Sequence, residues 1–204
     1  MDILNYNVDV SAKNYQVLAF LKMGEQLGFS YIKTYTAYKY AEKIKNMKRK
    51  KQEQEQQSLL KKQNIKILLA GHPYNLYDNL IGKVVTDFLK ENNITIFYSN
   101  KIDHTKVKEE YQKIAPDMHW THNKEIVAST KYYEDYVDGI ILISSFPCGP
   151  DSLMNEQIAH KIKKIPLITL IFEDLNNETG IITRLESFID ILTNLKEEKN
   201  GQNN

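Results

Sequence analysis

The sequence predicts an α/β protein, with a four-stranded, doubly wound parallel sheet of strand order 2-1-3-4 and an N-terminal helical segment. Three observations predict this class. Short continuous apolar runs recur after residue 64, as expected of strands buried on both faces of a parallel sheet. Segments with apolar residues at three- and four-residue spacing alternate with these runs, which indicates helical crossovers. The part before residue 65 lacks such runs and has a helical pattern.

The N-terminal helical segment, 1–64, carries an apolar stripe from about residue 11. The stripe is interrupted once and is formed by Val17, Leu18 and Leu21, then after Gly28 by Tyr31, Tyr35, Tyr38 and Ala41. From residue 48 the sequence KRKKQEQEQQSLLKKQ favours a helix but is nearly free of apolar residues. We interpret it as the solvated end of a long connecting helix, with a basic partner-docking surface as the alternative.

The α/β domain is predicted over 65–195. Its first strand is IKILLAG, at 65–71, and a helix with apolar positions from Leu76 to Leu89 follows. The second strand is ITIFYS, at 94–99, and residues 100–120 are interpreted as an irregular polar stretch.

The alternation then continues to the end of the domain. A helix at about 121–135 precedes the third strand, DGIILISSF, at 138–146. A helix at about 151–164, a fourth strand, PLITLIF, at 166–172, and a last helix bearing Leu185, Phe188, Ile189 and Leu192 complete it. Residues 196–204 are predicted to be a disordered tail. For a doubly wound sheet with right-handed crossovers and helices on both faces, we expect the order 2-1-3-4.

Ligands bind such sheets outside the carboxyl ends of the strands, where the strand order reverses, here between the first and third strands. The loops that leave these two strands should therefore face each other across a crevice. The candidate ligand-binding residues are Gly71, His72, Pro73, Tyr74 and Asn75 on the first loop and Ser145, Gly149, Asp151 and Ser152 on the second, SSFPCGPDS.

Cys148 is the only cysteine in the chain. With Pro150 as the first residue of the next helix, it lies just before a helix N-terminus, where unpaired amides favour a thiolate. Position alone leaves three roles open: a nucleophile, a soft-metal ligand and a small thiol in a tight turn. A nucleophile needs a base, for which His72 is the natural candidate. His119 and His122, which flank Trp120, are more remote candidates.

Anion recognition is predicted at a second set of residues. The chain has neither a Walker A loop nor a G-x-G-x-x-G sequence. Thr183 and Arg184, after Gly180, could meet an anion together with Gly71, or Arg184 could form a salt bridge to Glu173, Asp174 or Glu186. Glu173 and Asp174, at the end of the fourth strand, form either a cation or hydroxyl site or a solvated acidic pair.

Composition restricts the partners. The formal net charge is +1, which gives no global field to attract nucleic acid or an anionic membrane surface. The strongly apolar runs are shorter than the roughly 20 residues that cross a bilayer. The chain start lacks the pattern of a secretory signal, so we expect a cytoplasmic protein.

Four blocks resemble a known family: GHPYN, DMHWTHNKEIVAS, DGIILISSFPCGPDS and IFEDLNNETGIITRLESF. Together they resemble the C-terminal portion of acyl-CoA dehydratase activase-related proteins, which are relatives of 2-hydroxyacyl-CoA dehydratase subunits and of double-cubane iron–sulfur proteins. The blocks run from about residue 65 to 192, and the preceding helices fit more loosely.

The resemblance implies a Rossmann-like domain, an anaerobic metabolism, and an iron–sulfur cluster that accepts an electron from an ATP-hydrolysing activator. Cys148 matches the cysteine of the family's SF-x-CGPD block. The GRPYN block is matched by Gly71, Pro73, Tyr74 and Asn75, with His72 in place of arginine, and the TRLE block by Thr183, Arg184 and Glu186. Where the family commonly has Asp-Glu-His, this chain has Glu173, Asp174 and Leu175.

One cysteine cannot hold a cluster alone, since clusters usually take three or four thiolates. An iron–sulfur cluster is therefore expected only with ligands from another chain. The first interpretation is a small subunit or split fragment that completes a cluster or acyl-CoA site with a cysteine-bearing dehydratase-like subunit, an ATP-dependent activator or a second copy of itself. The alternatives are a stand-alone binding or regulatory domain for a phosphate-bearing or acyl-CoA ligand, and a hydrolase or transferase that uses Cys148 with His72.

Overall fold

The computed structural model describes residues 15–146, 148–173 and 178–201. The chain divides into two compact units, Met1–Gln52 and Glu53–Asn204. The expected boundary after residue 64 differs from this division, because the end of the long helix packs with the second unit.

The first unit contains helix α1 (Tyr15–Gln26) and most of helix α2 (Tyr31–Ser58). Gly28 has a φ of +77°, a conformation that side chains rarely adopt. Its amide donates to the Glu25 carbonyl, and the Phe29 amide donates to the Gly24 carbonyl, so the last carbonyls of α1 are satisfied as the chain turns. The interruption expected at Gly28 is thus a turn between two helices.

Large apolar side chains are exposed on this helical unit. They are Leu18, Phe20, Leu27, Phe29, Tyr31, Ile32, Tyr35, Tyr40 and Met47. No helix in the described part of the chain combines the length and the apolarity needed to cross a membrane.

The second unit is built on four parallel strands: β1 (Lys66–Gly71), β2 (Thr95–Tyr98), β3 (Gly139–Ser145) and β4 (Leu167–Phe172). Their order in the sheet is β2-β1-β3-β4. The predicted α/β class and strand order are therefore confirmed, and the order reverses between β1 and β3.

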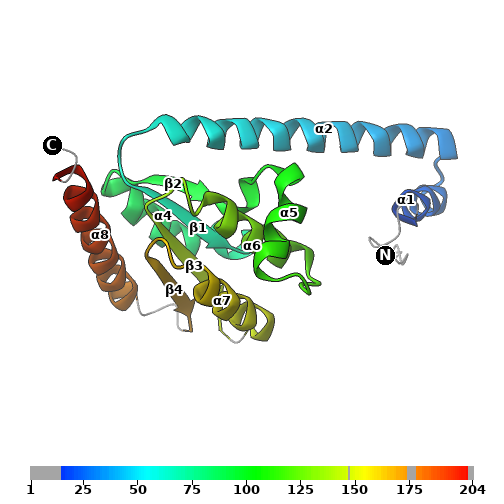
Figure 1. Ribbon diagram of the computed structural model, residues 1–204. Coiled ribbons are helices and arrows are strands. Elements are labelled where there is room, and N and C mark those ends of the chain that lie inside the picture. The colour runs from blue at the N-terminus through cyan, green and yellow to red at the C-terminus, as the bar shows by residue number, and fades with distance from the viewer. Residues whose placement is uncertain (1–14, 147, 174–177, 202–204) are drawn as a thin grey trace. The chain divides into compact units, whose positions relative to one another are not determined.

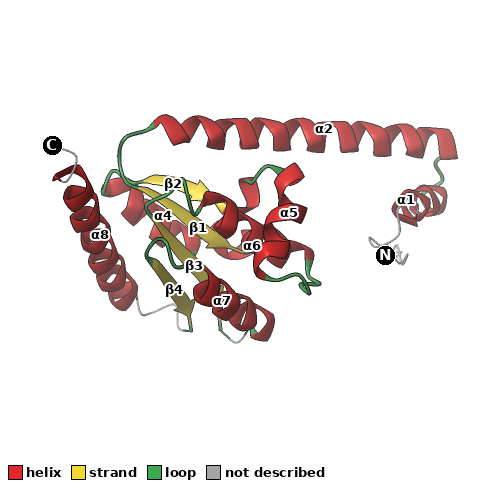
Figure 2. Ribbon diagram, in the orientation of Figure 1, coloured by secondary structure: helices red, strands yellow, loops and turns green. Residues whose placement is uncertain are grey.

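Helices cover both faces of the sheet (Figures 1 and 2). Ile67 and Leu69 of β1 point to the face packed by α4 (Gly82–Glu91) and α8 (Glu178–Gly201). Leu68 and Ala70 point to the other face, packed by α5 (His104–Ile114), α6 (Thr121–Tyr133) and α7 (Gly149–Lys161). Because both faces are buried, the strands read as continuous apolar runs.

The end of α2 is anchored in the sheet unit by one buried glutamine. The Gln56 side chain donates to the Tyr98 carbonyl and to the Tyr133 hydroxyl, each at 3.0 Å, and accepts from the Tyr98 amide at 2.8 Å. The 3-10 turn η1 (Leu59–Lys61) follows and packs its two leucines on the core. The solvated connecting helix predicted from the sequence therefore ends in a specific contact.

One predicted element is wrong, because most of the expected irregular stretch 100–120 is helix α5. Asp103 caps this helix by accepting from the Thr105 amide at 2.9 Å. Val107, Tyr111 and Ile114 lie on its buried side, and lysine and glutamate residues separate them along the sequence. Their spacing is helical, but so few apolar positions give a weak pattern.

Three boundaries also differ from expectation. The helix expected from Leu76 is divided into α3 (Pro73–Leu76) and α4, because the Asp78 carboxylate accepts from the Leu80 and Ile81 amides in a turn between them. Helix α7 starts at Gly149, which makes Pro150 its second residue. Helix α8 continues to Gly201, so 196–201 is helical, and 202–204 lies outside the described residues.

Candidate functional site

The ends of β1 and β3 and the loops that follow them lie side by side. Gly71 pairs with Ile143 at the end of the β1–β3 ladder. A Cβ on Gly71 would lie 2.6 Å from the Ile143 carbonyl oxygen, so only glycine allows this close approach. The Ser145 hydroxyl donates to Asn75 Oδ1 at 3.0 Å and joins the two loops directly. We refer to this junction as the crevice: the loop and α3 that follow β1, and the start of α7 that follows β3.

A histidine and a carboxylate cross the crevice. His72 Nε2 lies 2.9 Å from Asp151 Oδ1, and the Asp151 side chain is only 1% exposed. The second carboxylate oxygen, Oδ2, is buried and has no hydrogen-bond partner among the described residues. The Tyr74 ring stacks on the His72 ring at a centroid distance of 5.0 Å. This group holds the β1 loop against the first turn of α7.

Cys148 occupies the N-cap position of α7 and is partly buried. The pKa of its thiol is raised, first by burial and further by the Asp151 carboxylate, while the Asp151 backbone amide acts in the opposite direction. The thiolate expected from the helix N-terminus is therefore not favoured. Burial and a neighbouring acid outweigh the helix amides.

Alkylation of Cys148 should report this raised pKa. We expect the iodoacetamide rate to rise with a midpoint above the free-cysteine value of about 8.5. Asp151→Asn should lower the midpoint, because it removes the neighbouring negative charge. Ser152→Ala is the control, since the Ser152 hydroxyl donates to the Cys148 carbonyl and not to the sulfur. A wild-type midpoint below the free value would contradict the assignment.

The histidines do not form a nucleophile–base arrangement with Cys148. His72 is paired with Asp151, and the His122 ring meets the His72 ring edge-on at 5.9 Å. His122 also lies 3.5 Å from Glu125, which in turn is 3.7 Å from His104. The acid, not an imidazole, is thus the charged group that acts on the thiol. His119 lines a different cavity, described below.

Two residues of α8 were expected to bind an anion, but their hydrogen bonds do not connect them to the crevice. The Arg184 guanidinium donates to the Thr169 carbonyl of β4 at 2.8 Å. The Thr183 hydroxyl donates to the Thr179 carbonyl within α8. Glu173 is exposed at the end of β4, and Asp174 and Leu175 lie outside the described residues.

Two further candidate residues after β3, Gly149 and Ser152, are exposed. Gly149 is exposed, and a Cβ there would meet nothing within 4 Å. Ser152 is exposed and bonds back to its own turn. Pro73 is partly buried as the first residue of α3.

The described residues do not fit a self-contained metal or iron–sulfur centre. No group of three or more histidine, cysteine or acidic side chains within 15–146, 148–173 and 178–201 is arranged to hold a metal ion. The raised thiol pKa also disfavours the deprotonated form that a metal requires. Cys148 alone therefore provides one possible ligand at most.

Two contacts of the crevice were missed by the sequence analysis. Ser99, after β2, accepts from the Gly71 amide at 3.3 Å and donates to the Gly71 carbonyl at 3.2 Å. Asn155 donates to the Ser144 hydroxyl at 3.3 Å and is buried. Asn155 follows Asp151 by one helical turn, and a polar pair at this spacing on the buried side of a helix was a usable signal.

The strand order and the helices on both faces define a doubly wound α/β domain, and the crevice lies at the switch point of its sheet. Residues 1–102, half of the chain, match the family described as CoA enzyme activase uncharacterised domain, and the chain belongs to this family. The activase-related relationship expected from the sequence blocks is therefore confirmed. The match includes GHPYN and the preceding helices, whereas the other three blocks lie beyond it. Comparisons with curated proteins and with solved structures find no match.

Proposed function

We propose that this chain is a small subunit or split fragment of a 2-hydroxyacyl-CoA dehydratase-like iron–sulfur system. It contributes Cys148 and an acyl-CoA or anion-binding crevice to a site that a partner completes. The position of Cys148 carries this proposal: a partly buried residue at the N-terminus of α7, next to the His72–Asp151 pair that holds the two loops. Membership of a CoA enzyme activase family supports the connection to CoA substrates.

A partner is needed because the chain supplies one thiolate and a cluster usually takes three or four. A partner that covers the exposed apolar side chains of the α1–α2 unit would remove them from water. The cysteine-bearing partner is a dehydratase-like subunit or an ATP-dependent activator.

The crevice suits an anion at one end only. The Asp151 carboxylate, buried with a free oxygen, repels negative charge at the inner end. The exposed Gly149, at the N-terminus of the 13-residue helix α7, leaves open space where amides attract negative charge. The phosphates of a CoA ligand would therefore lie at this outer end.

Anaerobic co-expression with the neighbouring reading frames tests the proposal. The purified complex is expected to contain iron and sulfide, and Cys148→Ser is expected to lower the iron content while the complex still forms. Ser152→Ala, an exposed neighbour of Cys148, is the control and should keep the iron. A complex without iron, or iron unaffected by Cys148→Ser, would contradict the shared centre.

The second candidate is a stand-alone binding domain without redox chemistry, and the raised pKa of Cys148 favours it. In that case the isolated protein binds acetyl-CoA. Acetyl-CoA at one hundred times its Kd should then add about 2.7 kcal/mol to the free energy of unfolding. Cys148→Ser should leave this stabilisation intact. The contacts favour a hydrolase or transferase less, because His72 is paired with Asp151.

A further inference from the structure

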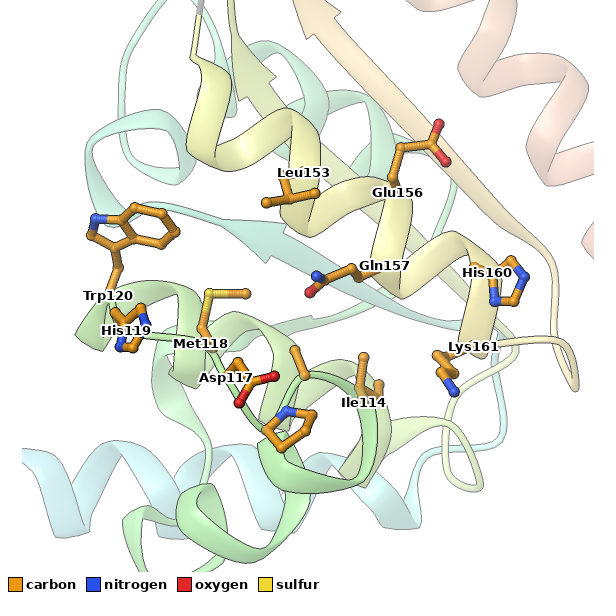
Figure 3. A pocket seen from close by; sticks show the side chains of 12 residues that line it. Ile114, Asp117, Met118, His119, Trp120, Leu153, Glu156, Gln157, His160 and Lys161 are labelled. Carbon is orange, nitrogen blue, oxygen red and sulfur yellow. The ribbon is translucent and has the colours of Figure 1, made fainter.

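A cavity lies away from the crevice, between α7 and the connection from α5 to α6 (Figure 3). Its volume is about 590 Å³, within the range of small-molecule sites. It is lined by residues 114–120 on one side and by Leu153, Glu156, Gln157, His160 and Lys161 on the other.

The α7 wall is one continuous face of the helix. Its five lining residues recur at three- and four-residue spacing. The residues that α7 buries in the core, Asp151, Met154, Asn155 and Ile158, form a separate face. The cavity wall is therefore not used in packing the sheet.

Trp120 forms one end of the cavity and is 49% exposed. It occupies the N-cap position of α6, where it makes no side-chain capping bond and where small polar residues are preferred. Met118 and Leu153 lie next to it and add apolar surface (Figure 3). A helix-capping role does not explain an indole at this position. A role as a flat apolar surface on which a ligand stacks does explain it.

Gln157 places an unsatisfied acceptor in the same cavity. Its Oε1 atom is buried, and no hydrogen-bond partner for it lies within the described part of the chain. Figure 3 shows its amide between the Met118 side chain and the α7 backbone, directed toward the middle of the lining residues. A buried acceptor without a donor is costly, and a bound N–H group would satisfy it.

The charges of the lining select against an anion. Asp117 and Glu156 carry two negative charges, and Lys161 carries one positive charge. With both lining histidines neutral, the formal sum is −1. An uncharged or cationic ligand is therefore preferred.

We propose that this cavity binds a small planar aromatic molecule, uncharged or cationic, that stacks on Trp120 and donates an N–H to Gln157 Oε1. The proposal is independent of the crevice, because none of the lining residues belongs to the loops that follow β1 and β3. If this cavity does not bind such a molecule, the proposed function is unaffected.

Trp120 is the only tryptophan, so the single indole N–H signal in a ¹H–¹⁵N spectrum reports on the cavity. Titration with 2-aminobenzimidazole, adenine and benzamidine is expected to move this signal saturably for at least one of them. Naphthalene-2-carboxylate, a planar anion without an N–H donor, is expected to bind more weakly than that probe.

Gln157→Met removes the acceptor at similar volume and is expected to weaken binding about fivefold to tenfold, the loss of one hydrogen bond. Gln112→Met, the same change at an exposed site outside the cavity, is the control and should leave binding unchanged. Leu153→Ala, at an exposed position, provides a second test that does not risk the fold and should also weaken binding. An indole signal that no probe moves, or equal affinity in the wild type and Gln157→Met, would overturn the proposal.

Discussion

Asp151→Ala is expected to lower the free energy of unfolding by about 2–3 kcal/mol, the range for a hydrogen bond to a charged group. The change leaves His72 without its partner and removes an acidic side chain from the first turn of α7, where it stabilises the helix. Chemical denaturation measures the difference. Asp190→Ala, at an exposed position of α8, is the matched control and should stay within about 0.5 kcal/mol of the wild type. An equal, small effect at both positions would show that Asp151 does not hold the crevice.

Gly71→Ala is expected to cost about 2 kcal/mol, as for overpacked cores. The new Cβ would lie 2.6 Å from the Ile143 carbonyl oxygen, which is backbone and cannot rotate away. Strands β1 and β3 would have to separate where the crevice opens, so weaker binding of any crevice ligand should accompany the loss of stability. Thermal and chemical denaturation measure the cost.

Gly149→Ala is the matched control for this substitution, because a Cβ at that position meets nothing within 4 Å. It should cost less than Gly71→Ala, since no atom opposes the new Cβ and only the conformational restriction before Pro150 remains. If both alanine variants are equally stable, the close approach of β1 and β3 does not constrain the site.

The sheet could be predicted because its signals are local. Runs such as IKILLAG and GIILISS are almost continuously apolar, which marks strands covered on both faces, and right-handed crossovers with helices on both faces favour the observed order. This strand order alone predicted that the loop with His72 and the segment with Asp151 would face each other. Helix α5 was missed because Val107, Tyr111 and Ile114 are its few core contacts in a polar sequence.

The properties of individual side chains could not be predicted in the same way. The pKa of Cys148 depends on burial and on the placement of Asp151, and both arise from tertiary packing. Arg184 meets Thr169 because of where α8 lies along β4, which no spacing in the sequence fixes. The cavity at Trp120 likewise forms only when α7 packs beside the α5–α6 connection.

A double-mutant cycle between His72 and Asp151 tests the central geometry most directly. The cycle compares His72→Ala, Asp151→Ala and the double variant by chemical denaturation, and isolates the energy that the two side chains share. A pair at 2.9 Å across the crevice predicts a coupling of about 1–2 kcal/mol, so the double variant should lose less than the sum of the single variants. Effects that add to within about 0.3 kcal/mol would mean that the two loops do not meet through this pair, and would contradict the account.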